Sequence, residues 1–143
     1  MSKIKVIACD IYGTVLCEDD PENIMPLRRG FIEFIKRVKK YDIRLVSTSD
    51  ANSTNLVIDL NDTFEGRAPF DSGIFDRHYH LAMIPKYYST LLENFAIRPE
   101  ELLIIGNNEY KDLSAAPALA IKKLVPTYKG VTDEFDFNSI ILS

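Results

Sequence analysis

The sequence predicts an α/β protein, a three-layer α/β/α sandwich built on a mainly parallel, Rossmann-like sheet. Strand-like and helix-like segments alternate along the 143 residues, which is typical of a parallel sheet covered by helices on both faces. The run Leu-Leu-Ile-Ile at 102–105 is continuously apolar, as expected of a strand buried on both sides. The length suits one hydrophobic core, so we expect a single domain over residues 1–143.

The first half of the chain contains two predicted strands and two predicted helices. Residues 4–9 form an apolar, β-rich run, and residues 43–48 form a second one. Between them, apolar side chains at helical spacing predict an amphipathic helix over 27–40. Ser49 offers an N-cap for a second helix. The apolar side of that helix consists of Leu56, Val57 and Leu60.

The middle of the chain is harder to assign. Residues 61–84 are rich in Gly, Pro and aromatic side chains, and we expect a loop with a short strand near 74–82. Pro85 suits the first turn of a helix, which should extend to about residue 96.

The last third begins with the strand at 102–105. A helix should start near Tyr110, and Pro117 should shorten or kink it. The apolar residues of 121–126 predict a last core strand, and the tail at 135–142 should pack as a strand or turn on an edge.

Composition narrows the classes of function. The net charge of −4 argues against a general nucleic-acid or membrane-surface binder. No apolar run approaches the roughly 20 residues that a membrane-spanning helix needs. The chain starts directly on a strand without the pattern of a signal peptide, and Cys9 and Cys17 offer no disulfide framework. We therefore expect a cytoplasmic protein with reduced cysteines.

The most informative stretch is the junction after the first strand, Asp10-Ile-Tyr12-Gly13-Thr14. It places a carboxylate at the carboxyl end of a central strand, where open α/β sheets bind ligands. Capping of the following turn is the simpler role for Asp10. A second pattern, Gly106-Asn107-x4-Asp112, follows the strand at 102–105.

Together these patterns resemble motifs of the haloacid dehalogenase (HAD) superfamily, Asp-x-Asp-Gly-Thr and Gly-Asp-x4-Asp. The resemblance implies that Asp10 is a nucleophile that forms a covalent intermediate. It implies that Thr14 supports the motif turn, that Thr48 or Ser49 binds the transferred group, and that Lys86 neutralises the nucleophile and the bound anion. Helix capping for Ser49 and a solvated surface position for Lys86 are the alternatives.

The resemblance also implies a Mg²⁺ site. Its ligands would be Asp10, the backbone carbonyl of Tyr12, Asn107 and Asp112, because Mg²⁺ prefers hard oxygen ligands. Asn107 stands where the family has an acid. Its amide carbonyl brings no charge, so we expect a lowered affinity for the metal.

Tyr12 is the second departure, since the family's phosphatases have an acid there that protonates the leaving group and then activates water. A tyrosine is protonated at neutral pH and can donate a hydrogen bond, but it is a poor base. Losing general acid–base help costs roughly 10²–10⁴ in rate. Tyr12 is therefore expected to act as a weak donor in a slow enzyme.

The spacing leaves little room for a cap domain, because only residues 11–47 separate Asp10 from Thr48. Capless members of the family act on macromolecules or borrow a lid from a partner subunit. The resemblance therefore implies a phosphorylated small molecule or macromolecule as substrate, and it is compatible with a homo-oligomer.

Three hypotheses follow. The first is a slow Mg²⁺-dependent phosphohydrolase of the HAD type. The second is a catalytically retired HAD domain that binds a protein or a phosphorylated ligand, because two acids are lost. The third is a 2-haloacid dehalogenase, because dehalogenases of the family carry Tyr at the position of Tyr12 and need no metal; the absence of a cap weakens this hypothesis.

Overall fold

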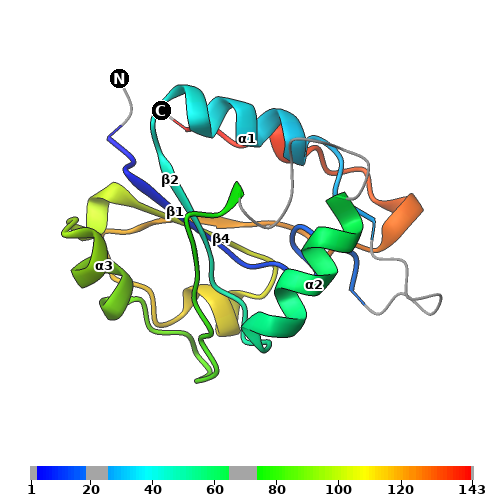
Figure 1. Ribbon diagram of the computed structural model, residues 1–143. Coiled ribbons are helices and arrows are strands. Elements are labelled where there is room, and N and C mark those ends of the chain that lie inside the picture. Colours follow the sequence, from blue (N-terminus) through cyan, green and yellow to red (C-terminus); the bar gives the residue numbers. More distant parts are fainter. Residues whose placement is uncertain (1–2, 19–25, 65–73, 143) are drawn as a thin grey trace.

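The computed structural model describes residues 3–18, 26–64 and 74–142. Its centre is a five-stranded sheet in the order β3-β2-β1-β4-β5, and all paired strands are parallel (Figure 1). The strands are β1 (Val6–Cys9), β2 (Arg44–Ser47), β3 (Arg77–His78), β4 (Leu102–Gly106) and β5 (Ile121–Leu124). The sequence prediction of an α/β sandwich on a parallel sheet is confirmed.

Helices cover both faces of this sheet. In the view of Figure 1, α1 lies above the strands and α3 below them. The helices are α1 (Phe31–Lys40), α2 (Ser53–Phe64), α3 (Ser89–Phe95), the 3-10 helices η2 (Pro99–Glu101), η4 (Gly130–Thr132) and η5 (Phe137–Ser139), and the π-helical turn η3 (Glu109–Leu113).

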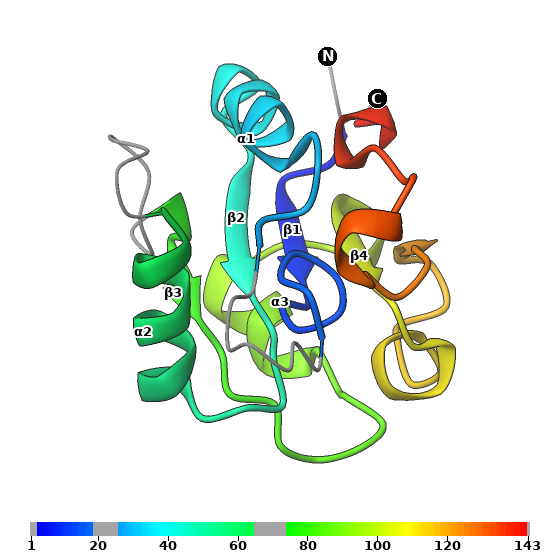
Figure 2. The same ribbon diagram turned by 90° about the vertical axis from the view of Figure 1, so that its right-hand side faces the viewer.

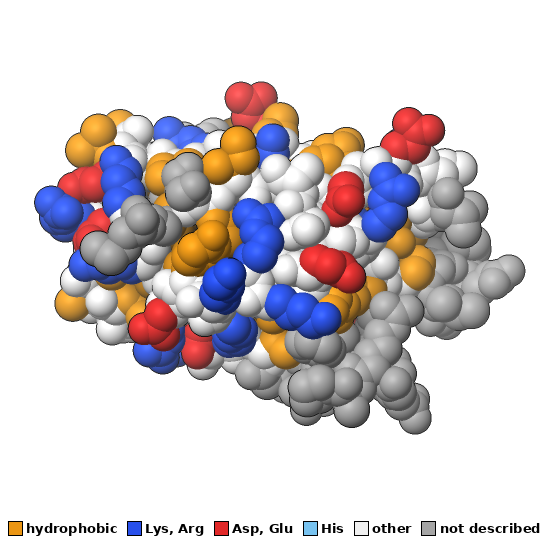
Figure 3. Space-filling view, turned by 90° about the horizontal axis from the view of Figure 1, so that it is seen from above, with side chains coloured by type: hydrophobic (Ala, Val, Ile, Leu, Met, Phe, Trp, Pro, Cys, Tyr) orange, Lys and Arg blue, Asp and Glu red, His pale blue; other side chains and the backbone are white. Residues whose placement is uncertain are grey.

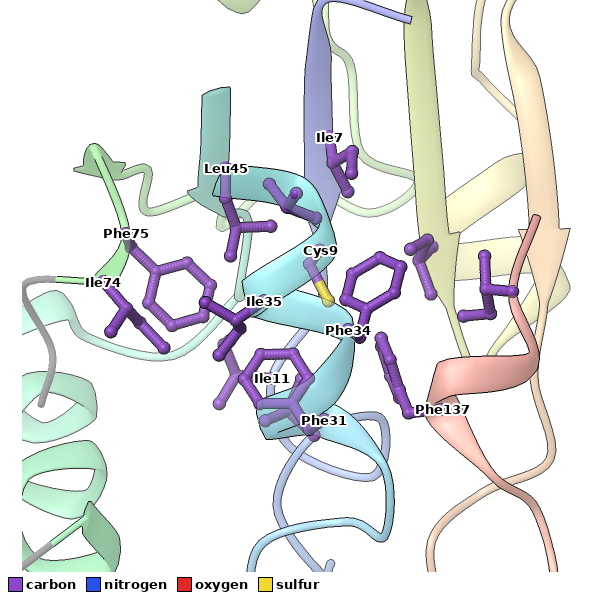
Figure 4. Close-up of a cluster of buried hydrophobic side chains, with 14 of the residues drawn as sticks. Ile7, Cys9, Ile11, Phe31, Phe34, Ile35, Leu45, Ile74, Phe75 and Phe137 are labelled. Atoms are coloured by element: carbon purple, nitrogen blue, oxygen red, sulfur yellow. The ribbon is translucent and has the colours of Figure 1, made fainter. Parts of the chain in front are cut away.

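The side chains of each strand alternate between two cores. Ile7 and Cys9 of β1 point to the α1 side, where they meet Phe31, Phe34 and Phe137 (Figure 4). Val6 and Ala8 of β1 point to the α3 side, and Tyr79, Tyr88 and Leu91 belong to that second cluster. Because both faces are covered, β1 and β4 contain no charged or strongly polar side chain, as the run at 102–105 predicted.

Helix α1 is amphipathic, and its buried residues have the predicted spacing: Phe31, Phe34, Ile35 and Val38. The predicted start at residue 27 is wrong. Leu27 pairs with Leu16 in an antiparallel bridge, and Gly30 adopts a left-handed conformation with φ 83° directly before the helix. Residues 27–30 are thus held by the loop after β1 and cannot join the helix.

The start of α2 also differs from the prediction. Asn52, not Ser49, accepts a hydrogen bond from the first turn, through its side-chain oxygen and the N–H of Thr54 (2.8 Å). The strand predicted near 74–82 is present as β3, but it has only two residues. The rest of the 61–84 stretch falls partly outside the described residues.

The helix predicted to start at Pro85 starts instead at Ser89. The N–H of Lys86 donates to the carbonyl of Lys111 (2.8 Å), so this segment is tied to the turn after β4. Residues 85–88 therefore lie before the helix, and Lys86 is held against that turn.

The end of the chain departs most from the prediction. Strand β5 is an edge strand, with three of its four residues exposed, and not a core strand. The helix expected near Tyr110 is the short turn η3. The tail forms η4 and η5 and packs beside α1 (Figure 1), where Phe137 is fully buried. It adds no strand to the sheet within the described residues.

The α1 side of the molecule carries mixed charge. Figure 3 shows basic and acidic side chains interspersed with hydrophobic ones on this face. No cap domain is evident in the part of the chain that the structure describes. Nor does any helix in those ranges combine the length and the apolar character needed to cross a bilayer.

Candidate active site

The predicted functional residues gather where the parallel strands end. Asp10 follows β1, Thr48 follows β2, and Asn107 follows β4. Figure 2 shows the loop after β1 directly below that strand. Parallel strands bring their carboxyl ends to one edge, so residues far apart in the sequence meet there.

Two carboxylates and one ammonium form the centre of the site. Lys86 Nζ donates to Asp10 Oδ1 (2.9 Å) and to Asp112 Oδ1 (2.6 Å). The three residues are almost completely buried, with exposed fractions of 6% for Asp10, 1% for Lys86 and 2% for Asp112. A buried charge is stable only when it is paired and hydrogen-bonded, and Lys86 pairs with both acids. The structure therefore places Lys86 inside the site.

Burial and charge act in opposite directions on these groups. Burial raises the pKa of Asp10 to about 6, although the Lys86 ammonium lowers it; the Asp112 charge adds to the increase. Burial alone would lower the pKa of Lys86, but the Asp10 and Asp112 carboxylates outweigh it and raise that pKa above its usual value. The lysine is thus held in its charged form between the acids.

Asp112 can approach Lys86 because of the glycine at the end of β4. A Cβ on Gly106 would lie 2.4 Å from Asp112 Oδ2, which is shorter than any real contact. The N–H of Asn108 donates to Asp112 Oδ2 (3.1 Å), and the buried Tyr88 hydroxyl donates to the Asp112 carbonyl (2.7 Å). The Gly-x5-Asp spacing therefore has a steric reason, whereas the bond from Tyr88 has no signal in the sequence.

Thr14 connects the nucleophile position to Asn107. Its hydroxyl oxygen lies 3.1 Å from Asp10 Oδ2 and 3.1 Å from Asn107 Oδ1. The Asn107 amide in turn donates to the Thr127 hydroxyl (3.0 Å). A hydroxyl has one proton, so Thr14 donates to only one of the two oxygens at a time.

The two candidates for a phosphoryl-binding hydroxyl differ in structure. Ser49 Oγ accepts a hydrogen bond from the N–H of Ala51 (3.0 Å) and so closes a local turn. Thr48 Oγ1 is buried and has no hydrogen-bond partner among the described residues. The Tyr88 hydroxyl lies nearby. Burial and the charges of Asp112 and Asp10 raise the pKa of Tyr88, whereas the interaction with the Thr48 hydroxyl lowers it.

An unsatisfied buried hydroxyl costs roughly 1–3 kcal/mol, and a ligand that accepts its hydrogen bond removes that cost. Of the two predicted residues, Thr48 is thus the one whose hydroxyl is available to a ligand.

Tyr12 turns away from this centre. Its hydroxyl donates a short hydrogen bond to Asp59 Oδ2 on α2. Burial, then the hydrogen bond to Asp59 and its negative charge, raise the pKa of Tyr12 far above its ordinary value. The partner Asp59 lies 47 residues away in the sequence, and no sequence pattern signalled it.

A buried arginine braces the loop after β1. Arg28 donates to the carbonyl of Thr14 (3.1 Å) and makes two bonds to the Asp133 carboxylate, at 2.7 and 3.2 Å. The N–H of Tyr128 donates to the carbonyl of Gly13 (2.7 Å). The segment after β5 thus supports the motif loop directly through Tyr128 and, by way of Arg28, through Asp133, which sequence reasoning missed.

The side chains at this sheet edge include oxygen donors of the kind that binds Mg²⁺. In the described ranges, no group of three His, Cys, Asp or Glu side chains forms a metal cluster. Asp10, Asn107 and Asp112 still bring carboxylate and amide oxygens to one sheet edge, and Thr14 Oγ1 lies within 3.1 Å of an oxygen of two of them. These are the hard donors that Mg²⁺ prefers, with waters completing its shell. The residues fit the metal in donor type, with one charge fewer than three acids would supply.

Comparison with known proteins gives the fold. Neither the protein-family models nor the curated protein sequences matched this chain. Solved structures did. The N-terminal part of a Bacteroides fragilis protein, containing a phosphatase domain complexed with Mg, is 15% identical with a TM-score of 0.66; the match covers 87% of this chain but only 37% of that one.

Two further structures match over most of both chains. The D,D-heptose 1.7-bisphosphate phosphatase from B. bronchiseptica, complexed with magnesium and phosphate, is 16% identical with a TM-score of 0.63, covering 90% of this chain and 84% of that one. A HAD-superfamily hydrolase of subfamily IA from Geobacter sulfurreducens PCA is 15% identical with a TM-score of 0.62, covering 90% and 92%. Read together with the parallel sheet and the site at its edge, these matches show that the chain has the HAD-like fold.

Proposed function

We propose that this protein is a slow phosphohydrolase of the HAD type, with Asp10 as its nucleophile. The observation that carries the proposal is the position of the Asp10 carboxylate, which lies at the end of the central strand between the ammonium of Lys86 (2.9 Å) and the hydroxyl of Thr14 (3.1 Å). The names of the structural neighbours, a phosphatase domain and a bisphosphate phosphatase, support the same class of reaction.

In this proposal one oxygen of Asp10 attacks phosphorus, and the bond from phosphorus to the leaving group breaks. The product is a covalent aspartyl phosphate, which water hydrolyses in a second step. Lys86 and Thr14 hold the carboxylate in position for the attack. The unpaired hydroxyl of Thr48 donates to a phosphoryl oxygen, which gives its buried proton an acceptor.

Asp10, the backbone carbonyl of Tyr12, Asn107 and Asp112 would hold Mg²⁺ in this proposal. When bound, the ion neutralises phosphoryl charge and orients the transferred group. Lys86 already neutralises part of the carboxylate charge, and Asn107 contributes no charge. Both features predict a weak requirement for the metal, with affinity lower than that of a site with three acids.

The substrate in this proposal is a phosphorylated small molecule or macromolecule. The site lies at an open sheet edge, and no cap domain is evident in residues 3–18, 26–64 and 74–142. Selection of the substrate would then fall to the loops around the sheet edge or to a partner subunit.

The test is hydrolysis of p-nitrophenyl phosphate with and without Mg²⁺, beside the Asp10→Asn variant. We expect slow release of nitrophenolate that Mg²⁺ accelerates and that disappears in Asp10→Asn. Retention of the activity in Asp10→Asn would show that a contaminant or another group is responsible. Lys86→Met should lower the rate at least tenfold, because the variant leaves two buried carboxylates without their shared cation.

Tyr12 favours a second candidate, a 2-haloacid dehalogenase, since in that reaction an aspartate attacks carbon and no acid at the Tyr12 position is needed. Release of halide from 2-chloropropionate in the presence of a chelator would support it. Silence in both assays would leave the hypothesis of a binding domain, which a thermal shift with phosphate or beryllium fluoride would then test.

A further inference from the structure

In the proposed reaction most leaving groups must be protonated as they depart. The hydrogen bonds of the site show which side chains could supply that proton. Tyr12 follows Asp10 by two residues, at the place in the motif where the resemblance implies a general acid. The single proton of its hydroxyl is donated to Asp59, a carboxylate on α2, and is therefore directed away from Asp10.

Three other polar groups among the described residues of the site, Lys86, Asp112 and Asn107, are also unable to supply a proton. Lys86 donates to Asp10 and Asp112, and giving up a proton would break two buried ion pairs at once. Both oxygens of Asp112 accept hydrogen bonds, one from Lys86 and one from the N–H of Asn108. Asn107 carries an amide, which cannot serve as an acid at neutral pH.

We infer that the enzyme cleaves only phosphate compounds whose leaving group departs as a stable anion, namely acyl phosphates, phosphoanhydrides and aryl phosphates. Simple alkyl phosphate esters are excluded as good substrates. The inference rests on the proposed function and names its substrate class.

The bond changes balance without an acid. Asp10 forms a bond to phosphorus, and the bond between phosphorus and the leaving oxygen breaks, leaving its electron pair on that oxygen as a carboxylate, phosphate or phenolate. Water then attacks phosphorus, the bond to Asp10 breaks, and the proton of the water passes to solvent. None of the described groups Tyr12, Lys86 and Asn107 is a free base for the second step, so the aspartyl phosphate should accumulate.

The chemistry of the leaving group sets the size of the effect. A carboxylate or a phenolate derives from an acid with a pKa of about 4 or about 10, whereas an alkoxide resembles hydroxide, whose conjugate acid has a pKa of about 15.7. General acid catalysis compensates for this difference by roughly 10²–10⁴. Without general acid catalysis, the rate should depend strongly on the basicity of the leaving group.

The experiment is a series of kcat/KM measurements at pH 7.5 with Mg²⁺. The substrates are acetyl phosphate, aryl phosphates with phenols of graded acidity, and glycerol phosphate. We expect kcat/KM to fall steeply as the leaving group becomes more basic, with glycerol phosphate at least 100-fold below p-nitrophenyl phosphate. Rapid mixing should show a burst of about one nitrophenolate per protein, because nitrophenolate leaves in the first step and hydrolysis of the aspartyl phosphate is slower.

Two variants of one position make the test specific. Tyr12→Asp introduces the missing acid, and it should raise kcat/KM for glycerol phosphate, relative to kcat/KM for p-nitrophenyl phosphate, by roughly 10²-fold. Tyr12→Phe removes only the hydroxyl and its bond to Asp59, and it should leave the slope of the series unchanged. Circular dichroism and a thermal unfolding curve establish that both variants are folded.

Several outcomes would overturn the inference. Equal rates for alkyl and aryl phosphates would do so while leaving the proposed function intact. A steeper dependence on the leaving group in Tyr12→Phe would also do so, because it would make the Tyr12 hydroxyl the acid.

Glu18 is the other side chain to test, since its Oε2 lies 3.2 Å from the position of a Cβ on Gly13. A steeper series in Glu18→Gln would assign the acid to Glu18. No turnover with any substrate would remove the proposed function and the inference together.

Discussion

Asp10, the proposed nucleophile, is a buried side chain whose charge lowers the stability of the fold. Its pKa is raised from 3.8 to about 6, and burial is the main cause. Below pH 3.8 the carboxyl is protonated in the folded and unfolded chain, and it costs nothing. Between pH 3.8 and about 6 the unfolded chain releases this proton while the folded chain still holds it, so the free energy of unfolding falls across that interval and levels off above it.

We therefore predict that Asp10→Asn abolishes activity and stabilises the fold at pH 8. The interval from 3.8 to about 6 corresponds to about 3 kcal/mol at most, since a pKa difference of one corresponds to about 1.4 kcal/mol. Urea unfolding at pH 8 in a chelator should show the gain, and unfolding near pH 3.5 should not. Lys86 keeps its second partner, Asp112, in the variant.

The exposed Glu33 provides a matched control, because Glu33→Gln removes one charge outside the site and should change stability by less than about 0.5 kcal/mol. A loss of stability in Asp10→Asn at pH 8 would mean that the ion pair with Lys86 outweighs burial, contrary to the raised pKa.

At the scale of the elements, the end of β4 determines whether the site can form. Gly106→Ala places a methyl group 2.4 Å from Asp112 Oδ2, so Asp112 must move away from Lys86. We expect at least a tenfold loss of activity and about 1–3 kcal/mol of destabilisation, the usual cost of overpacking. Hydrolysis of p-nitrophenyl phosphate and urea unfolding measure the two effects.

Gly130→Ala separates steric clash from backbone strain. Gly130 has φ +75°, and a Cβ there would meet nothing closer than Cys17 Sγ at 3.5 Å. This variant should lose roughly 1–2 kcal/mol for the left-handed backbone and keep its activity. Equal activity in Gly106→Ala and Gly130→Ala would refute the steric account of Gly106.

Element prediction succeeded where a local pattern determines the element. The spacing of Phe31, Phe34, Ile35 and Val38 identified α1 correctly, because an apolar stripe of this period must face a core. It failed where a distant partner takes the backbone. Leu27 pairs with Leu16 ahead of α1, and the segment with Lys86, which bonds to Lys111, precedes α3.

At the scale of the whole molecule, the tail after β5 contacts both the core beside α1 and the arginine that braces the loop after β1. Phe137 is fully buried and meets Phe31 edge-on, with ring centroids 5.0 Å apart, and Phe34 at 4.9 Å. The same segment supplies Asp133, which pairs with Arg28 beneath the motif loop. Anchoring of the tail on α1 therefore supports the loop that carries Asp10.

We predict that Phe137→Ala destabilises the protein by about 3–5 kcal/mol through lost burial and a cavity. Ile141 lies four residues further along the tail and is 75% exposed, so Ile141→Ala should change stability by less than about 0.5 kcal/mol. Thermal unfolding of the two variants measures the difference. Similar stability in both would show that the tail does not contribute to the core.

The sequence by itself determined the sheet, the amphipathic helix and the position of Asp10, because each depends on the order and period of neighbouring residues. Asp112 was predicted through the resemblance of Gly106-Asn107-x4-Asp112 to a motif of the HAD superfamily. Only the tertiary structure decided that Lys86 lies between the acids. It likewise left the hydroxyl of Thr48 without a partner and directed Tyr12 to Asp59. These contacts join segments far apart in the chain, and packing of the elements, not local pattern, selects such partners.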